Sequence, residues 1–330
     1  MIDTMRNPGV HAEPVHPWVA EGHGSVRFGI VGGPRGDWPA LSDFVRMVEE
    51  LGFDSFWRPD HPLLLPDCWT ILAAVAATTH QLRLGSLVSC VYYRNPVPLA
   101  RIVADVDDIS RGRVVLGLGA GDMEGEFRSM GLAYPTLRAR QAALAEALEV
   151  VPRLLRGEEV IYQGSPIQVT RAAPRPHPER QPYVPLLVGG GGEHATLGLV
   201  ARHADASSLG AGSWGGGAAT DTDVRRKYAR LRELGAEVGR PDAAVLHTFH
   251  FVPVLLADSP PALAPKRERV PQELLASAAT SGLVGTPEHA VERLRPLVAA
   301  GCQYFTLAVS DPDTLRLLAD RVVPAVTGSL

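Results

Sequence analysis

The stretch Gly52–His61 (GFDSFWRPDH) is the first place where residue types and spacing suggest chemistry. An apolar run ends there in Asp60 and His61. An imidazole exchanges protons near neutral pH, and a neighbouring carboxylate can orient it or bond a heterocycle. Two interpretations stay open for the isolated segment: a reactive pair, or a solvated turn between Pro59 and Pro62.

A second group of candidates follows the glycine run at 117–126 (GLGAGDMEGE). The dinucleotide-binding fingerprint needs a third glycine where Asp122 stands and an acid about 20 residues further on, near Gln141, and both are missing. The segment instead predicts a tight glycine turn that brings an acid to a site. Of the three acids present, Asp122 is preferred over Glu124 and Glu126 because it is nearest to the preceding strand.

A third candidate is the run Gly189–Gly192 in VGGGGEHATLGLVAR, which leads into a predicted helix. Glycine amides at a helix N-terminus suit a phosphate because no Cβ atoms block the approach. The alternative is a flexible strand-to-helix turn. Four consecutive glycines cost more chain entropy than a turn requires, which favours the anion site.

A metal site is not predicted. His247 and His250 lie three residues apart on a predicted strand, so they face opposite sides. Cys68, Cys90 and Cys302 are too far apart for a paired spacing, which suggests reduced thiols in a cytoplasmic protein.

Composition narrows the function class further. The 330 residues carry a net charge of −4, which gives no reason to expect binding to nucleic acid or to an anionic membrane surface. No apolar run approaches the roughly 18 residues of a membrane span. Residues 1–25 lack the apolar centre of a signal peptide and are predicted to be a disordered arm.

Short β-rich runs alternate with helical patterns through the rest of the chain. The predicted strands are 26–31, 54–57, 82–90, 113–118, 185–188, 206–209, 244–256 and 303–309. The predicted helices are 39–51, 68–79, 97–109, 137–155, 193–203, 221–238, 287–300 and 312–326. Two stretches interrupt the rhythm, at 157–182 after the fourth helix and at 257–283 after the seventh strand, and they are predicted to be insertions that act as lids. The first reads as a β-hairpin around Gly164-Ser165.

This alternation predicts parallel βαβ units, in either an open doubly wound sheet or a closed (β/α)8 TIM barrel. The count of eight strands favours the barrel, with residues 26–330 as a single domain. Reactive groups of barrels sit at the carboxyl ends of the strands, where the three candidate segments lie.

Five segments together resemble the luciferase-like flavin monooxygenases and deazaflavin-dependent oxidoreductases, a superfamily of (β/α)8 barrels. They are GFDSFWRPDH, LRLGSLVSCVYYRNPVPLARIVADVDDISRGRVVLGLGAG, PLLVGGGGEHATLGLVARHADA, LVGTPEHAVERLRPLVAAG and the last strand. The resemblance runs from about residue 26 to the last helix.

The Asp-His pair resembles members that use the deazaflavin coenzyme F420, in which the histidine and an acid after strand 4 lie beside the reactive ring. By this resemblance the catalytic residues are His61 and Asp122. The sugar-phosphate enzymes have glutamate where this chain has Asp122, and a tryptophan where it has Leu64-Leu65, so a sugar-phosphate substrate is not implied.

The resemblance also supplies a cofactor site. Many members have a non-proline cis peptide that backs the ring, and the matching bond is Leu87–Val88. The implied cofactor-binding residues are Asp60, Leu87, Val88, Ser89, Gly119, Ala120, Gly121, Gly189, Gly190, Gly191 and Gly192. Asp60 is expected to position either the ring or His61.

The predicted function is hydride transfer with coenzyme F420 on a small organic substrate. One alternative is an FMN-dependent monooxygenase supplied with reduced flavin by a separate reductase, and another is a non-catalytic flavin-binding barrel. By resemblance alone, a homodimer is expected.

Overall fold

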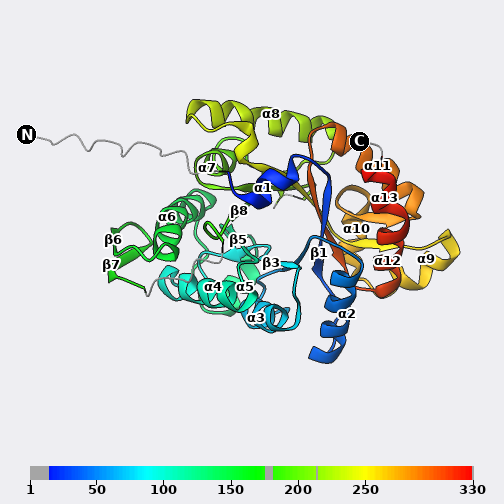
Figure 1. The fold of residues 1–330 in the computed structure, drawn as a ribbon, viewed down its shortest axis with the longest axis horizontal. Helices are drawn as coiled ribbons and strands as arrows, with labels where there is room; N and C mark the ends of the chain where they lie inside the picture. The colour runs from blue at the N-terminus through cyan, green and yellow to red at the C-terminus, as the bar shows by residue number, and fades with distance from the viewer. Residues whose placement is uncertain (1–14, 175–180, 213–214, 329–330) are drawn as a thin grey trace, which may run out of the picture.

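The structure is a computed structural model that describes residues 15–174, 181–212 and 215–328. Its centre is a closed barrel of parallel strands, as the sequence predicts (Figure 1). The strands are hydrogen-bonded in the order β3-β2-β1-β13-β10-β9-β8-β5, and a pairing between β3 and β5 closes the ring. A short strand, β4, extends the edge beside β5. The bounds are β1 Arg27–Gly32, β2 Ser55–Arg58, β3 Arg83–Ser86, β4 Ser89–Cys90, β5 Val114–Gly119, β8 Leu186–Gly189, β9 Ala206–Gly210, β10 Leu246–Phe251 and β13 Tyr304–Val309.

Helices surround this barrel and connect successive strands (Figure 1). They are α2 Trp38–Glu50, α3 Cys68–Thr78, α4 Pro96–Ser110, α6 Leu137–Leu155, α7 Thr196–His203, α8 Asp221–Glu237, α11 Pro287–Ala299, α12 Pro312–Leu317 and α13 Val323–Thr327. A short extra helix, α5 Glu124–Ser129, follows β5. Many of the helices begin at side-chain caps, which the sequence places there: Asp37, Asp67, Asn95, Thr136, Thr220, Thr286 and Asp311. No helix in the described ranges is both long and apolar enough to cross a bilayer.

The core has two layers. The larger lies between strands and helices, and the smaller fills the barrel interior with Trp18, Val19, Val31, Trp57, Val115, Leu187, Ala206, Leu246 and Tyr304. Trp57 crosses the interior where Gly29 and Gly85 leave space. A Cβ added to Gly85 would lie 2.1 Å from the indole ring, and one added to Gly29 would lie 2.6 Å from its nitrogen. These glycines are therefore part of the packing.

The prediction that residues 1–25 form a disordered arm is wrong for the part of the arm that the structure describes. Helix α1, Pro17–Gly22, lies at the amino-terminal end of the barrel, and Trp18 and Val19 are fully buried. The Trp18 ring lies 5.8 Å from that of Tyr304. The burial of the apolar side chains of Trp18 and Val19 orders this helix despite the polar composition of the arm. Residues 1–14 lie outside the described residues.

The first insertion contains the predicted hairpin, formed by β6 Val160–Gln163 and β7 Gln168–Ala172. It packs on the outside of α6, where Glu146 accepts the amides of Ser165 and Ile167 at 2.8 Å. In Figure 1 the hairpin projects beside α6, away from the strand ends. These contacts give no support to a lid role for the hairpin. Residues 175–180 of this insertion lie outside the described residues.

The second insertion follows β10, at the carboxyl end of the barrel. It consists of β11 Val254–Leu256, α9 Pro260–Arg267, α10 Gln272–Ser281 and β12 Leu283–Gly285, with β11 and β12 paired in parallel. Lys266 anchors it, because its Nζ lies 2.6 Å from Asp311 Oδ1 and 2.9 Å from the Leu256 carbonyl. Lys266 thus ties the second insertion to the barrel.

Candidate active site

His61 lies just beyond the carboxyl end of β2, and its imidazole contacts Glu126. Nδ1 of His61 lies 2.8 Å from Glu126 Oε2, and the Tyr93 hydroxyl donates to the same oxygen at 3.1 Å. Glu126 is buried, whereas the His61 side chain is 31% exposed. The pair therefore has a buried side that fixes it and an open side that faces solvent.

From the sequence, Glu126 was a candidate that ranked below Asp122, because Asp122 is nearer to the preceding strand. The missed signal is the pattern of α5, where Glu126 and Phe127 are buried while Glu124, Gly125 and Arg128 are exposed. An acid beside a phenylalanine on the covered face of a short helix has to meet a donor inside the protein.

Asp122 itself is exposed, and its backbone carbonyl accepts a hydrogen bond from the Tyr134 hydroxyl at 3.1 Å. Its side chain forms no hydrogen bond or ion pair with His61 within the described residues. Of the acids after β5, Glu126 is therefore the one placed to act on His61, and a catalytic role for Asp122 stays a prediction.

Asp60 does not contact His61. Its carboxylate pairs with Arg94 at 2.6 Å and receives a longer bond, 3.4 Å, from the Cys90 amide. Burial raises the pKa of Asp60, although the Arg94 guanidinium opposes the shift. Asp60 thus fixes the β4 segment through Arg94, and the expectation that it orients His61 is not met.

The cis peptide expected at Leu87–Val88 is present. Both residues are partly exposed and pack against the inner core. Val88 rests on a floor of glycines: an added Cβ would lie 2.4 Å from its side chain at Gly119, and 3.1 Å from it at Gly117 and at Gly189. Gly119 and Gly189, two of the glycines predicted to bind cofactor, therefore make room for the Val88 side chain, and Leu87 and Val88 are called the platform below.

The remaining residues predicted around this platform have different surroundings. The Ser89 hydroxyl accepts a bond from the Trp69 indole at 3.0 Å, so its side chain points into the protein. Gly121 has a φ of +79°, and an added Cβ would lie 2.8 Å from Cys90 Sγ. Ala120 is half-buried.

An aromatic wall lies beside the His61–Glu126 pair. It consists of Tyr92, Tyr93, Phe127 and Tyr134, with Phe127 at the centre and ring centroids 5.2 to 5.6 Å from it. Arg140 lies 4.1 Å above the Tyr134 ring and donates to the Gly121 carbonyl at 3.0 Å. The wall holds α5 and the glycine turn in one arrangement.

The predicted phosphate loop, Gly189–Gly192, follows β8. The Gly190 amide donates to the Ser208 carbonyl at 3.0 Å, so it is not available to a ligand. The amides of Gly191, Gly192 and Glu193 donate no hydrogen bond to the described residues. The amides that could donate to an anion therefore begin at Gly191, two residues after the start of the glycine run.

Lys227 of α8 supports this loop from inside. Its Nζ donates to the Gly191 carbonyl at 2.8 Å and to Glu193 at 3.1 Å, and its side chain is 5% exposed. Gly216 packs against the Gly191 backbone, where an added Cβ would lie at 2.5 Å. Sequence reasoning missed this lysine, because α8 has the pattern of an ordinary charged helix.

His247 and His250 face opposite sides of β10, as predicted. His247 stacks on Tyr228 at 4.1 Å, and its Nε2 lies 3.1 Å from Asp242. The His250 Nδ1 lies 3.0 Å from the Thr306 carbonyl, and burial lowers the pKa of His250 to about 4. Within the described ranges no group of three histidine, cysteine or acidic side chains is arranged to hold a metal ion.

Four aromatic residues are candidates from the sequence for lining the mouth of the barrel: Trp57, Tyr92, Trp214 and Phe251. Trp57 is fully buried inside the barrel, and Phe251 lies in the outer core. Trp214 lies outside the described residues.

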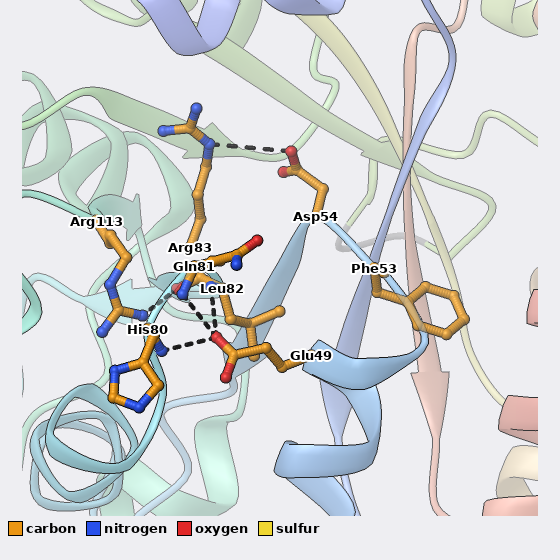
Figure 2. A pocket seen from close by; sticks show the side chains of 9 residues that line it. Glu49, Phe53, Asp54, His80, Gln81, Leu82, Arg83 and Arg113 are labelled. Atoms are coloured by element: carbon orange, nitrogen blue, oxygen red, sulfur yellow. Dashed lines mark hydrogen bonds and ion pairs between the residues drawn. The ribbon is translucent and has the colours of Figure 1, made fainter.

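A separate pocket of about 400 Å³ opens at the amino-terminal end of the barrel (Figure 2). Its polar groups bind one another. Glu49 accepts the amides of His80, Gln81 and Leu82, which lowers the pKa of its carboxyl against the opposing effect of burial. Arg113 donates to the carbonyls of Ala76 and Thr79 at the end of α3. The polar groups of this pocket are thus used in structural contacts between neighbouring segments. The candidate active site remains at the carboxyl ends of the strands.

The sequence profile of the luciferase-like monooxygenase family matches residues 21–266. The chain belongs to this family and is an oxidoreductase. The family resemblance and the barrel predicted from the sequence are both confirmed.

Relatives and solved structures agree with this assignment. The chain is 34% identical over 164 residues to the F420-dependent glucose-6-phosphate dehydrogenase of Microbacterium testaceum, which covers 47% of this chain and 48% of that protein. It is 25% identical to the 5,10-methylenetetrahydromethanopterin reductase of Archaeoglobus fulgidus, over 91% and 99% of the two chains.

Two solved structures share the fold. One is the coenzyme F420-dependent tetrahydromethanopterin reductase of Methanopyrus kandleri, with a TM-score of 0.76, 20% identity and coverage of 92% and 100%. The other is the oxygenating constituent of 3,6-diketocamphane monooxygenase of Pseudomonas putida in complex with FMN, with a TM-score of 0.69, 16% identity and coverage of 91% and 98%.

Proposed function

We propose that this protein is an oxidoreductase that transfers a hydride between coenzyme F420 and a small organic substrate. The observation that carries the proposal is the half-exposed His61, fixed by a buried acid at the strand ends where the Leu87–Val88 platform lies. The two relatives reported above, an F420-dependent dehydrogenase and a reductase, support it.

The residues present suit a flat ring that carries a phosphate. Leu87 and Val88 offer a partly exposed apolar surface, and the glycines beneath Val88 let that surface lie at the top of the barrel. The amides of Gly191, Gly192 and Glu193 would hold the phosphate, since backbone N–H groups at a turn before a helix suit anions. When bound, coenzyme F420 supplies a carbon that accepts or gives a hydride.

His61 has the task of handling the proton that accompanies the hydride. Its Nδ1 lies at hydrogen-bond distance from Glu126, its Nε2 forms no hydrogen bond with another described residue, and the side chain is 31% exposed. A positioned imidazole of this kind typically contributes about 10²–10⁴-fold to rate. Tyr92 and Tyr134, which pack on the buried Phe127 ring, would limit water near the exchanging proton.

The second candidate function is an FMN-dependent monooxygenase. The fold it shares with a diketocamphane monooxygenase in complex with FMN favours it, and the glycine loop serves either coenzyme's phosphate equally. This alternative would need a partner reductase to supply reduced flavin. His61 distinguishes the two. Hydride transfer from an alcohol carbon requires a base that takes the hydroxyl proton, and hydride transfer to a carbonyl carbon requires an acid that protonates the oxygen.

Fluorescence titration of the purified protein with F420 and with FMN tests the proposal. We expect saturable binding of F420 at micromolar concentration or below, and binding of FMN at least tenfold weaker. A His61→Ala variant should retain F420 binding within about threefold and lose about 10²-fold or more in turnover. Tight FMN binding without F420 binding would overturn the proposal in favour of the monooxygenase.

A further inference from the structure

Glu126 is the acid that contacts His61, and neither the sequence motifs nor the comparisons assign it a role. It comes from α5, a helix of six residues that the aromatic wall holds in place. Its carboxylate is buried, and its Oε1 has no hydrogen-bond partner in the described structure. A buried acid of this kind is costly unless the groups around it require it.

The hydrogen-bond directions around Glu126 follow from the chemistry of its neighbours. Oε2 lies within bonding distance of both His61 Nδ1 and the Tyr93 hydroxyl. Burial, with Cys90 and Glu126 adding to it, raises the pKa of Tyr93, so its hydroxyl keeps the proton and donates it. Oε2 of the Glu126 carboxylate therefore accepts both hydrogen bonds. Because it accepts the bond from His61, the Nδ1 atom of His61 must carry the proton.

We propose that Glu126 is the positioning residue of His61. It holds the imidazole in the tautomer with the proton on Nδ1, which leaves Nε2 as the atom that exchanges a proton, and Tyr93 holds the carboxylate in register. The role of Nε2 in turnover rests on the proposed function, whereas the tautomer is a property of the free protein.

The burial of the partners gives this arrangement its strength. An imidazole has two distinct nitrogens, and the one that reacts is decided by the bond that the other makes. Because Glu126 is screened from water, its bond to Nδ1–H is not weakened by solvent as an exposed pair would be. The neighbouring Glu124, paired with Arg128 on the exposed face of the same helix, lacks this advantage.

Nitrogen-15 NMR of the imidazole in the coenzyme-free protein tests the tautomer, with the His61 signals assigned by their loss in His61→Gln. We expect wild type to carry the proton on Nδ1 and a bare Nε2 at a pH where His61 is neutral. Glu126→Leu should give a mixture or the opposite tautomer, Tyr93→Phe should keep the wild-type tautomer, and the matched control Glu124→Gln should change nothing. A wild-type protein with its proton on Nε2 would overturn the proposal, as would an unchanged Nδ1–H signal in Glu126→Leu.

Turnover separates positioning from a structural effect. We expect Glu126→Leu to lose about 10²-fold in kcat with the coenzyme KM within threefold, and Glu126→Gln to recover part of the loss because its amide oxygen still accepts from Nδ1–H. Should Glu126→Leu fail to fold, Glu126→Gln provides the same comparison in milder form. A kcat at the wild-type level in Glu126→Gln, with the tautomer mixed, would contradict the link between tautomer and rate. Failure of F420 to bind would refute the proposed coenzyme. The NMR result would still test whether Glu126 sets the tautomer of His61, because that measurement uses the coenzyme-free protein.

Discussion

The two ends of the barrel use polar side chains in opposite ways. At the amino-terminal end, Arg27 is paired with Asp54 at 2.9 Å and bonds the Trp18 carbonyl, and Asp54 in turn receives the Tyr304 hydroxyl. At the carboxyl end, His61 is held on one side only. The first arrangement closes the barrel, while the second keeps a reactive face open to a ligand.

This difference shows how one fold separates stability from function. The closed end buries Trp18, Trp57 and Tyr304 completely. At the open end, His61, Leu87 and Val88 stay partly exposed, although Asp60 and Glu126 beneath them are buried. Substitutions at the two ends should therefore separate into losses of stability and losses of binding or turnover.

The largest stability effect is expected from Trp18→Ala. Removal of this fully buried indole from the barrel interior should cost about 3–5 kcal/mol in the free energy of unfolding. Urea unfolding measures the loss, and F420 affinity in the folded fraction should stay near wild type. A loss of coenzyme affinity at unchanged stability would contradict the division between the two ends.

Gly119→Ala should disturb the open end. The new Cβ would lie 2.4 Å from the Val88 side chain, so the platform must shift. We expect a stability cost of about 1–3 kcal/mol from overpacking and a coenzyme affinity at least tenfold weaker. Gly125→Ala is the matched control, since an added Cβ there has nothing within 4 Å, and it should bind F420 as wild type does.

A pH dependence should involve both ends. Burial lowers the pKa of His16 to about 4 at the closed end, with Arg83 contributing, and burial likewise lowers that of His250 at the open end. Because each folded-state pKa lies below the unfolded value, protonation favours unfolding. The stability is complete above about pH 6.5 and is lost as the pH falls towards about 4.

Thermal unfolding between pH 7 and pH 4.5 measures this effect. We expect His250→Asn and His16→Asn each to reduce the fall in Tm by about 1–2 °C, the shift that about 1 kcal/mol produces in a chain of 330 residues. His80→Gln, which replaces an exposed histidine, serves as control. An identical pH profile in wild type and both variants would refute the assignment.

The smallest effect is expected at the glycine loop. Lys227→Met removes the donor to the Gly191 carbonyl and should weaken F420 binding about three- to tenfold by loosening the loop. Arg226→Met is the matched control, because Arg226 pairs with the same Glu193 but its side chain is 53% exposed. Equal losses in the two variants would mean that only the charge of Glu193 matters.

The sequence predicted the fold well because its signals are local. Alternating apolar runs, helix caps and glycine turns marked all eight barrel strands, and α6 was predicted with its observed bounds, Leu137–Leu155. Helix α1 was missed because its stability comes from Trp18 inserting into a barrel whose interior only the closed fold creates.

The site was predicted less completely, for a related reason. Each predicted segment lies at a strand end, but the partners depend on tertiary packing. Glu126, Arg94 and Lys227 reach His61, Asp60 and Gly191 from other elements, 65, 34 and 36 residues away in the chain. Spacing along the sequence does not show which residues so far apart in the chain meet in the fold. Gly119 and Gly189, which the sequence suggests as cofactor-binding residues, leave space for the Val88 side chain, and only the folded structure shows this contact.

A crystal structure with F420 soaked or co-crystallised tests the central claim most directly. The account predicts a deazaflavin ring against Leu87–Val88, His61 Nε2 facing its reactive edge, and the phosphate on the amides of Gly191, Gly192 and Glu193. A ring bound elsewhere, such as in the pocket beside Glu49 and Arg113 at the closed end, would contradict it.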